Sequence, residues 1–186
     1  MKTLVLSDDS KTLNIISRTF ESYSIKVELS SVSHIEDIPP DASGMIIPNQ
    51  LDSNYANLFL QYAKKNKLKT LAVSRGLVSL LNFSNKLDCN IEEFSGGDST
   101  FLALGSKLAE IIGGAGPLNT HYSLNWEIPI RYLPNKFLLS GVNLSNGCIE
   151  AIEMEGNLEI IGIIWPIFSV QKIPFRFENI LSWISE

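Results

Sequence analysis

The chain has 186 residues, of which 45% are hydrophobic, and a formal net charge of −5 at pH 7. This length and composition predict one α/β domain, residues 1–186, with a full hydrophobic core. The acidic balance, with no basic cluster in the sequence beyond the lysines of residues 64–69, argues against nucleic acid as a partner. No apolar run approaches the roughly 20 residues needed to cross a bilayer, so we expect no membrane partner. The N-terminus leads directly into a predicted strand, without a basic n-region and an apolar h-region, so we expect no signal peptide.

Cysteine and histidine are scarce in this sequence. Cys89 and Cys148 are the only cysteines, and their spacing forms neither a disulfide framework nor a metal-binding pattern. We therefore expect a reducing, cytoplasmic location, with no metal and no other cofactor. His34 and His121 are the only histidines, so any mechanism that needs an imidazole must use one of them.

The N-terminal half alternates between predicted strands and helices. Asp8 and Asp9 suit the N-terminus of the first helix as capping acids. This alternation predicts a doubly wound, mostly parallel sheet. The predicted strands are residues 3–6, 26–29, 44–47 and 71–73, and the predicted helices are residues 11–22 and 54–65.

The C-terminal half has a different pattern. Residues 88–99 are polar and contain a Gly-Gly pair, which predicts a loop. Residues 175–184 predict a closing amphipathic helix. Between them, three predicted strands form an antiparallel extension of the sheet, with turns at residues 145–147 and 155–157; these strands are residues 138–143, 148–154 and 158–164.

The main candidate for chemistry lies in residues 69–83. A short apolar run, Leu71–Val73, leads through Ser74 into a segment with leucines at helical spacing. This pattern predicts a sharp strand-to-helix turn, a nucleophile elbow, with Ser74 at its tip and Gly76 allowing close approach of the backbone. Ligands of doubly wound sheets bind at the carboxyl ends of the strands, where both Ser74 and residues 48–50 fall.

Residues 72–83 (Ala-Val-Ser-Arg-Gly-Leu-Val-Ser-Leu-Leu-Asn-Phe) resemble the elbow of the γ-glutamyl hydrolase branch, peptidase family C26, of the class I glutamine amidotransferase-like superfamily. There the elbow reads roughly Gly-Ile-Cys-Arg-Gly-x-Gln-Leu-Leu-Asn-Val, so Ser74 falls where the family has its cysteine nucleophile. Residues 105–113, 118–120 and 146–153 resemble further family segments in the same order. The resemblance runs from about residue 44 to residue 165 and implies a flavodoxin-like fold.

Departures from the family pattern fall on the catalytic positions. The family takes its histidine and glutamate from a Trp-His-Pro-Glu segment, and here residues 165–168 place Pro166 and Phe168 at those two positions. The family's oxyanion loop is typically Pro-Gly-Gly, and here it is Pro48-Asn49-Gln50. Proline and phenylalanine cannot move a proton, and serine depends on a base more than cysteine does.

The resemblance also implies residues around the site. By position, Arg75 anchors the elbow by hydrogen bonds or holds an anionic ligand, and Trp165 is a packing residue. The expected ligand-binding set is Pro48, Asn49, Gln50, Arg75, Gly76, Asn119 and Thr120.

We therefore expect a catalytically degenerate glutamine amidotransferase-like protein that acts by binding. Its partner would be an enzyme subunit, a second copy of the chain, or a small amide or amino-acid-like ligand. The alternative is an active amidohydrolase or glutamine amidotransferase that uses Ser74 with an unrecognised base, for which His121 is the candidate. A third hypothesis is a structural role in an assembly, with Phe168 and its neighbours filling the pocket.

Overall fold

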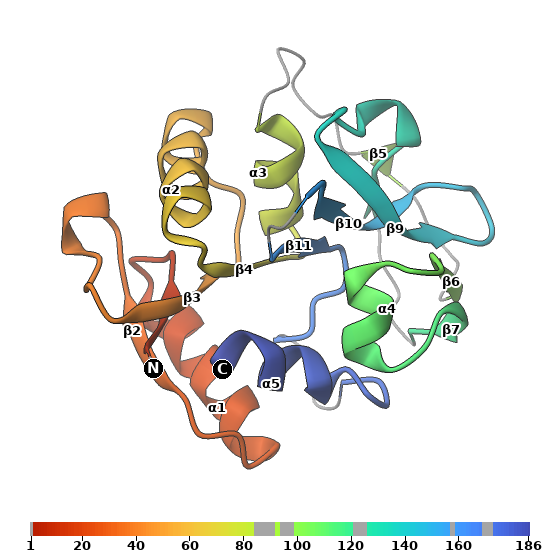
Figure 1. Cartoon of the computed structure of the whole chain (residues 1–186). Helices are drawn as coiled ribbons and strands as arrows, with labels where there is room; N and C mark the ends of the chain where they lie inside the picture. Colours follow the sequence, from red (N-terminus) through yellow and green to blue (C-terminus); the bar gives the residue numbers. More distant parts are fainter. Residues whose placement is uncertain (1, 84–91, 94–98, 121–125, 157–158, 169–172) are drawn as a thin grey trace.

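A nine-stranded sheet, in the order β2-β1-β3-β4-β11-β10-β9-β6-β7, forms the centre of the protein (Figure 1). The computed structural model describes residues 2–83, 92–93, 99–120, 126–156, 159–168 and 173–186. Neighbouring strands from β2 to β11 are parallel, and those from β11 to β7 are antiparallel. The parallel strands are β2 (Glu28–Ser31), β1 (Lys2–Val5), β3 (Ala42–Ile47), β4 (Lys69–Val73) and β11 (Ile160–Ile163). The antiparallel part adds β10 (Ile149–Met154), β9 (Phe137–Asn143), β6 (Ser99–Leu102) and β7 (Gly116–Asn119).

The doubly wound, mostly parallel sheet predicted from the sequence is confirmed, but the prediction for its last strand was incomplete. β11 pairs antiparallel with β10, as expected for strands joined by a short connection. It also pairs parallel with β4, from Ile160 opposite Thr70 to Ile163 opposite Val73. All four residues of β11 are buried, which is typical of a central strand covered on both faces.

Two further differences concern strand positions. β2 lies two residues later than predicted, at Glu28–Ser31. A small separate sheet pairs β5 (Glu92–Glu93) with β8 (Trp126–Glu127), so part of the predicted loop at residues 88–99 is strand. The rest of that predicted loop, apart from Ser99 in β6, lies outside the described residues.

Helices cover both faces of the sheet (Figure 1). On one face lie α2 (Ser53–Asn66) and α3 (Gly76–Asn82); on the other lie α1 (Ser10–Ser22), α4 (Lys107–Ile112) and α5 (Glu178–Ser185). Two 3-10 turns, η1 (Ile35–Asp37) and η2 (Ile130–Tyr132), lie in connections. None of the helices in these described ranges is long and apolar enough to span a bilayer.

The helix ends follow ordinary capping chemistry. Asp9 caps α1 as predicted, since its carboxylate accepts hydrogen bonds from the N–H groups of Lys11 (3.0 Å) and Thr12 (3.2 Å). These hydrogen bonds lower the pKa of Asp9. The last helix begins three residues later than the sequence pattern predicted, because residues 175–177 form a turn after Pro174.

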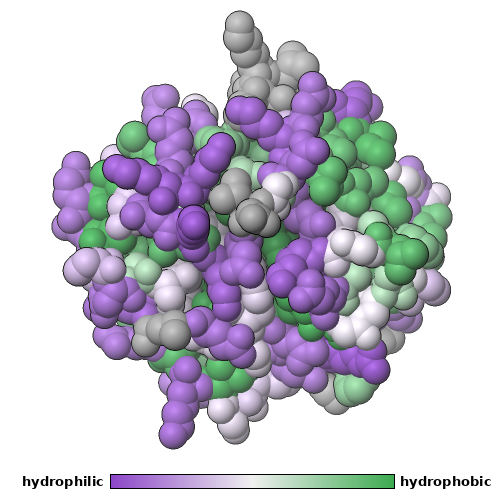
Figure 2. Space-filling view, viewed as in Figure 1, coloured by the Kyte–Doolittle hydropathy of each residue, from purple (hydrophilic) through white to green (hydrophobic). Residues whose placement is uncertain are grey.

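The surface in Figure 2 is hydrophilic over much of the face viewed, and one of its hydrophobic areas lies at the upper right, on the side where β9 lies in Figure 1. Leu138 and Ile130 are about half exposed there, at 48% and 53%.

Near the chain ends, the Thr3 hydroxyl donates to the Ile184 carbonyl at 3.2 Å, which ties β1 to α5. The helix that closes the chain thus packs directly on the first strand.

Gly76 marks the tightest contact between a helix and the sheet. A Cβ built on Gly76 would lie 1.9 Å from the carbonyl oxygen of Ile47, the last residue of β3. The first turn of α3 therefore approaches the end of β3 at a distance that only glycine allows. This contact fixes the direction in which the chain leaves β4.

We predict that Gly76→Ala lowers the free energy of unfolding by about 3 kcal/mol, because the added methyl group meets backbone that cannot turn aside. Urea unfolding monitored by circular dichroism measures this change. The matched control is Gly114→Ala, whose Cβ would meet nothing closer than 3.9 Å and which should change stability by less than about 1 kcal/mol. Equal, small effects of the two substitutions would contradict the close contact.

Candidate functional site

Ser74 lies at the turn between β4 and α3 in a left-handed backbone conformation, with φ of 54°. Its N–H donates to the Ile163 carbonyl at 2.8 Å, and its own carbonyl accepts from the Leu77 N–H at 3.0 Å. Serine in this conformation costs free energy that the surrounding contacts must offset. The strand, sharp turn and helix predicted for this segment are present, and Ser74 is at the tip of the turn.

A cavity of about 180 Å³, called here the Ser74 cavity, opens beside this turn. It lies at the carboxyl edge of the parallel strands, where the chain order reverses between β1 and β3, the usual ligand position in sheets of this type. The residues that line it come from α1, from the last residue of β4 and from the segments that follow β3, β4 and β11: Thr12, Ile15, Ile16, Pro48, Asn49, Val73, Ser74, Pro166 and Phe168.

The sequence prediction named five of these lining residues, and the structure brings all five around one cavity: Pro48, Asn49, Ser74, Pro166 and Phe168. Gln50, the third residue of the predicted oxyanion loop, is exposed and does not line the cavity. The contribution of α1 was missed by sequence reasoning, because nothing in a helical repeat tells which of its residues faces a distant turn.

The described lining residues carry no imidazole, carboxylate, thiol or amine. Their polar side chains are those of Thr12, Asn49 and Ser74, and the Thr12 hydroxyl is already within 2.9 Å of Asp9 Oδ2. The remaining walls are aliphatic, proline and phenylalanine side chains. Such a cavity suits a small ligand with an apolar body and one polar tip.

Phe168 is buried, at 7% exposed, and forms part of the hydrophobic core beside the cavity. Its ring lies 6.2 Å from the ring of Phe20 on α1, centroid to centroid. This distance is within the range of favourable aromatic pairs. Phe168 therefore both walls the cavity and joins α1 to the segment after β11.

Other predicted site residues lie elsewhere. Arg75 is exposed, and its guanidinium makes a cation–π contact 5.8 Å from the ring centre of Trp126. Its expected hydrogen bonds to the elbow and its binding of an anionic ligand stay predictions. Gly76 packs against β3 rather than lining the cavity. His121, the candidate base, lies outside the described residues, as does Cys89.

Asn119 and Thr120 lie at the outer edge of the sheet. Asn119 ends β7, the last strand of the sheet, and neither residue lines the Ser74 cavity. Five strand-to-strand steps separate β7 from β4, which is about 24 Å at roughly 4.8 Å per step. The structure therefore does not place these two residues beside Ser74, because β10, β9 and β6 lie between β7 and β11. Their expected role in binding a ligand stays a prediction.

A buried carboxylate supports the segment that carries Pro166. Glu150, 5% exposed, accepts hydrogen bonds from Asn143 Nδ2 (2.7 Å), from Trp165 Nε1 (3.1 Å) and from the Thr100 hydroxyl. Burial raises the pKa of Glu150, and the hydrogen bonds from Asn143 and Trp165 oppose that shift. The sequence signal for this group was one of two glutamates, Glu150 and Glu153, in an otherwise apolar strand.

Trp165 is a packing residue, as predicted, but it also carries this polar tether. Its ring lies 5.0 Å from that of Phe177, and the side chain is 1% exposed. The tether from Trp165 to Glu150 holds the chain where it turns toward Pro166 and Phe168. In the described parts of the chain, no three histidine, cysteine, aspartate or glutamate side chains gather as a metal site would need.

The fold places this chain among known structures. It matches a protein from Thermoplasma acidophilum that is described as a putative subunit of GMP synthase. The match covers 99% of this chain and 92% of the other, with a TM-score of 0.68 and 12% identity. It matches the glutaminase domain of Trypanosoma brucei CTPS, with bound acivicin, over 97% and 92% (TM-score 0.66, 13% identity). A chain of PurLQS from Thermotoga maritima matches over 98% and 99% (TM-score 0.66, 10% identity).

The chain therefore shares with these neighbours the flavodoxin-like, class I glutamine amidotransferase-like α/β fold that the sequence predicted. No protein-family model matches the sequence, and no curated protein matches it either. At identities of 10–13%, the likeness concerns the fold alone.

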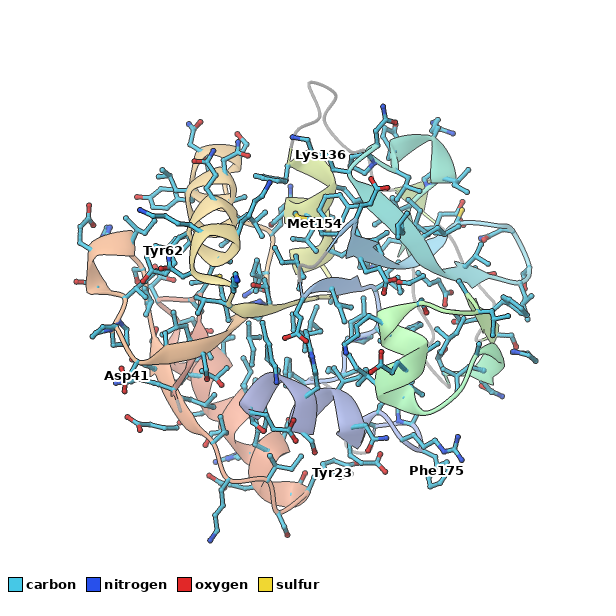
Figure 3. All side chains as sticks on the ribbon, in the orientation of Figure 1. Tyr23, Asp41, Tyr62, Lys136, Met154 and Phe175 are labelled. Atoms are coloured by element: carbon cyan, nitrogen blue, oxygen red, sulfur yellow. The ribbon has the colours of Figure 1, made fainter. Side chains whose placement is uncertain are left out.

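We predict that Phe168→Ala lowers the free energy of unfolding by about 3–5 kcal/mol, because it empties a buried aromatic position next to an existing cavity. Chemical denaturation measures the loss. Phe175→Ala is the control: this ring is 79% exposed at the periphery of the protein (Figure 3), and its removal should change stability by less than about 1 kcal/mol. A Phe168→Ala chain as stable as the parent would show that the ring is not part of the core.

The raised pKa of Glu150 predicts a specific pH dependence of stability. The folded protein binds this proton more tightly than the unfolded chain, whose glutamate pKa is near 4.5. Protonation therefore adds stability that is complete below pH 4.5 and is lost as the pH rises through the raised pKa of the folded state.

Unfolding free energies measured from about pH 4 to pH 7 test this pH dependence. Relative to Glu150→Gln, the parent chain should lose stability across that window, whereas the exposed control Glu155→Gln should follow the parent. Parallel pH profiles of the parent and Glu150→Gln would contradict the prediction.

Proposed function

We propose that this chain is a catalytically degenerate relative of the γ-glutamyl hydrolase branch of the glutamine amidotransferase-like proteins, and that it acts by binding. The observation that carries the proposal is the composition of the Ser74 cavity. Pro166 and Phe168 wall it where the resemblance predicts a histidine and a glutamate. A cavity with these walls can receive a ligand but has no described group that can take a proton from Ser74.

Amide hydrolysis requires more than a hydroxyl in the right place. A serine must lose its proton to a base as it attacks, and backbone N–H groups must stabilise the oxyanion. Asn49 and Gln50 replace the glycines of the family loop, so side chains occupy positions where bare backbone approaches the substrate. Members of a triad act as a unit, and with the base and its orienting group replaced, only binding remains.

Of the expected ligands, a small amide fits this cavity best, because the described lining residues carry no charged group that would pair with an amino acid. The cavity, at about 180 Å³, is smaller than the roughly 300–1,000 Å³ typical of drug-sized sites. Ser74 and Asn49 offer hydroxyl and amide groups that can pair with the amide of such a ligand. The aliphatic side chains of Ile15, Ile16 and Val73 would contact its hydrocarbon part.

A protein partner is the second part of the proposal. Two of the structural neighbours are described as part of PurLQS and as belonging to a GMP synthase. By analogy, the chain would associate with an enzyme subunit or with a second copy of itself.

One observation favours the alternative of an active enzyme. Ser74 keeps the left-handed φ of 54°, and strained backbone of this kind concentrates at functional positions. An enzyme of this type would use Ser74 as nucleophile and take its base, such as His121, from residues outside those described.

We predict that the purified chain releases neither ammonia nor glutamate from glutamine or γ-glutamyl amides above the uncatalysed rate. A coupled glutamate dehydrogenase assay measures this, with Ser74→Ala as the matched control. If the parent chain releases ammonia or glutamate and Ser74→Ala abolishes this release, the active alternative is correct. Loss of the same activity in His121→Ala would then identify His121 as the base.

Restoring the family's cysteine alone should not restore hydrolysis, because the base would still be missing. We predict that Ser74→Cys alone has no activity, because Pro166 supplies no base. The triple variant Ser74→Cys, Pro166→His, Phe168→Glu should gain a measurable but low rate, limited by Asn49 and Gln50 in the oxyanion loop. Strong activity in Ser74→Cys alone would mean that another residue already acts as the base.

A further inference from the structure

A second and larger cavity, of about 390 Å³, lies at the opposite edge of the sheet. We call it the amino-edge cavity, because it lies where β4 and β11 begin and β10 ends. It is separate from the Ser74 cavity and shares no lining residue with it. Its lining is Lys67, Leu68, Lys107, Leu138, Glu153, Met154, Gly156 and Glu159; Met154 is labelled in Figure 3.

Two of its four charged groups are held by the protein itself. Glu153, 9% exposed, accepts hydrogen bonds at one carboxylate oxygen from the backbone N–H groups of Lys107 (2.8 Å) and Leu108 (3.3 Å). Lys107 Nζ pairs with Glu110 Oε1 at 3.1 Å. Glu153 and Lys107 therefore shape the cavity and are largely satisfied without a ligand.

The other two charges are poorly matched within the described residues. Lys67 has no ion pair within 4.0 Å there, and the one ion pair of Glu159 is a long contact of 4.0 Å with Lys107 Nζ. A positive and a negative group thus face one cavity with little internal compensation. A ligand that carries both charges would pair with both and add no net charge to the site.

Lys67 occupies a position that favours another residue type. It directly follows α2 and has a φ of 54°, the left-handed conformation for which glycine is the usual choice. Leucine at position 138 is also unusual for its surroundings, because it is 48% exposed beside these charges. Contact with an apolar ligand group would remove part of that leucine surface from water.

We propose that the amino-edge cavity binds a free α-amino acid with an apolar side chain. The carboxylate of the ligand pairs with Lys67, its ammonium group pairs with Glu159, and its side chain packs on Leu138 and Met154. The volume of about 390 Å³ lies within the range of small-molecule sites. The site is independent of the proposed function at Ser74.

The test begins with localisation. Uniformly 15N-labelled full-length protein is titrated with L-leucine, and backbone amide shifts are followed by NMR. We expect shifts to cluster at Lys67, Leu68, Met154 and Glu159. Shifts confined to residues of the Ser74 cavity, or no shifts at 20 mM leucine, would overturn the proposal; the first of these outcomes would instead support ligand binding at Ser74.

Two analogues of leucine test the pairing of charges. 4-Methylpentanoate lacks the ammonium group and 3-methylbutylamine lacks the carboxylate, and each should bind about tenfold more weakly than leucine, the loss expected for one charged hydrogen-bonded pair. If either analogue binds as tightly as leucine, an amino acid is not the ligand class of this cavity.

Matched variants assign the residues. Lys67→Gln and Glu159→Gln should each raise the leucine Kd about tenfold. The controls Lys64→Gln, at the same helix end, and Glu155→Gln, in the same connection, should leave it unchanged, since neither residue lines the cavity. Lys67→Gly separates binding from folding: glycine suits φ of 54°, so this chain should stay folded and still lose leucine, and unchanged leucine binding by it would overturn the proposal.

Discussion

The close approach of Gly76 to the Ile47 carbonyl is the contact on which the arrangement of this protein depends. It brings the first turn of α3 against the end of β3, where any larger residue would collide with backbone. The chain must then reverse sharply after β4, and Ser74 takes up the left-handed conformation that this reversal requires. Ser74 and the segment after β3, Pro48 and Asn49, consequently border the same cavity.

The second support of this edge comes from β11, whose last residue accepts the hydrogen bond from the Ser74 N–H. The following segment is held through the bond from Trp165 to the buried carboxylate of Glu150. Burying a carboxylate is unfavourable unless donors surround it, and three side-chain donors do so here. The segment that follows β11 is thus held by a satisfied polar group, although Pro166 and Phe168 make the cavity itself mostly apolar.

Local patterns in the sequence predicted the parallel half of the fold well, because alternation of buried strands and amphipathic helices is encoded within each segment. The same local signals placed Ser74 at the elbow. Long-range pairing was harder to predict, because it depends on which strand edges remain open after the other strands have paired. Local patterns therefore did not show that β11 pairs with β4, or that β7 lies five strands away from β4. The unexpected distance of Asn119 and Thr120 from Ser74 has this origin, and so does the missed contribution of Thr12, Ile15 and Ile16 to the cavity.

Ser74 has the backbone geometry of a nucleophile, and we propose that it lacks the chemistry of one. The decisive measurement is the intact mass of the protein after incubation with a fluorophosphonate, which reacts with serines that a neighbouring base activates. We predict no adduct, with trypsin as the positive control in the same reaction. A stoichiometric adduct that peptide mapping assigns to Ser74 would contradict this proposal, since it would require a base beside Ser74 that the described walls of the cavity do not supply.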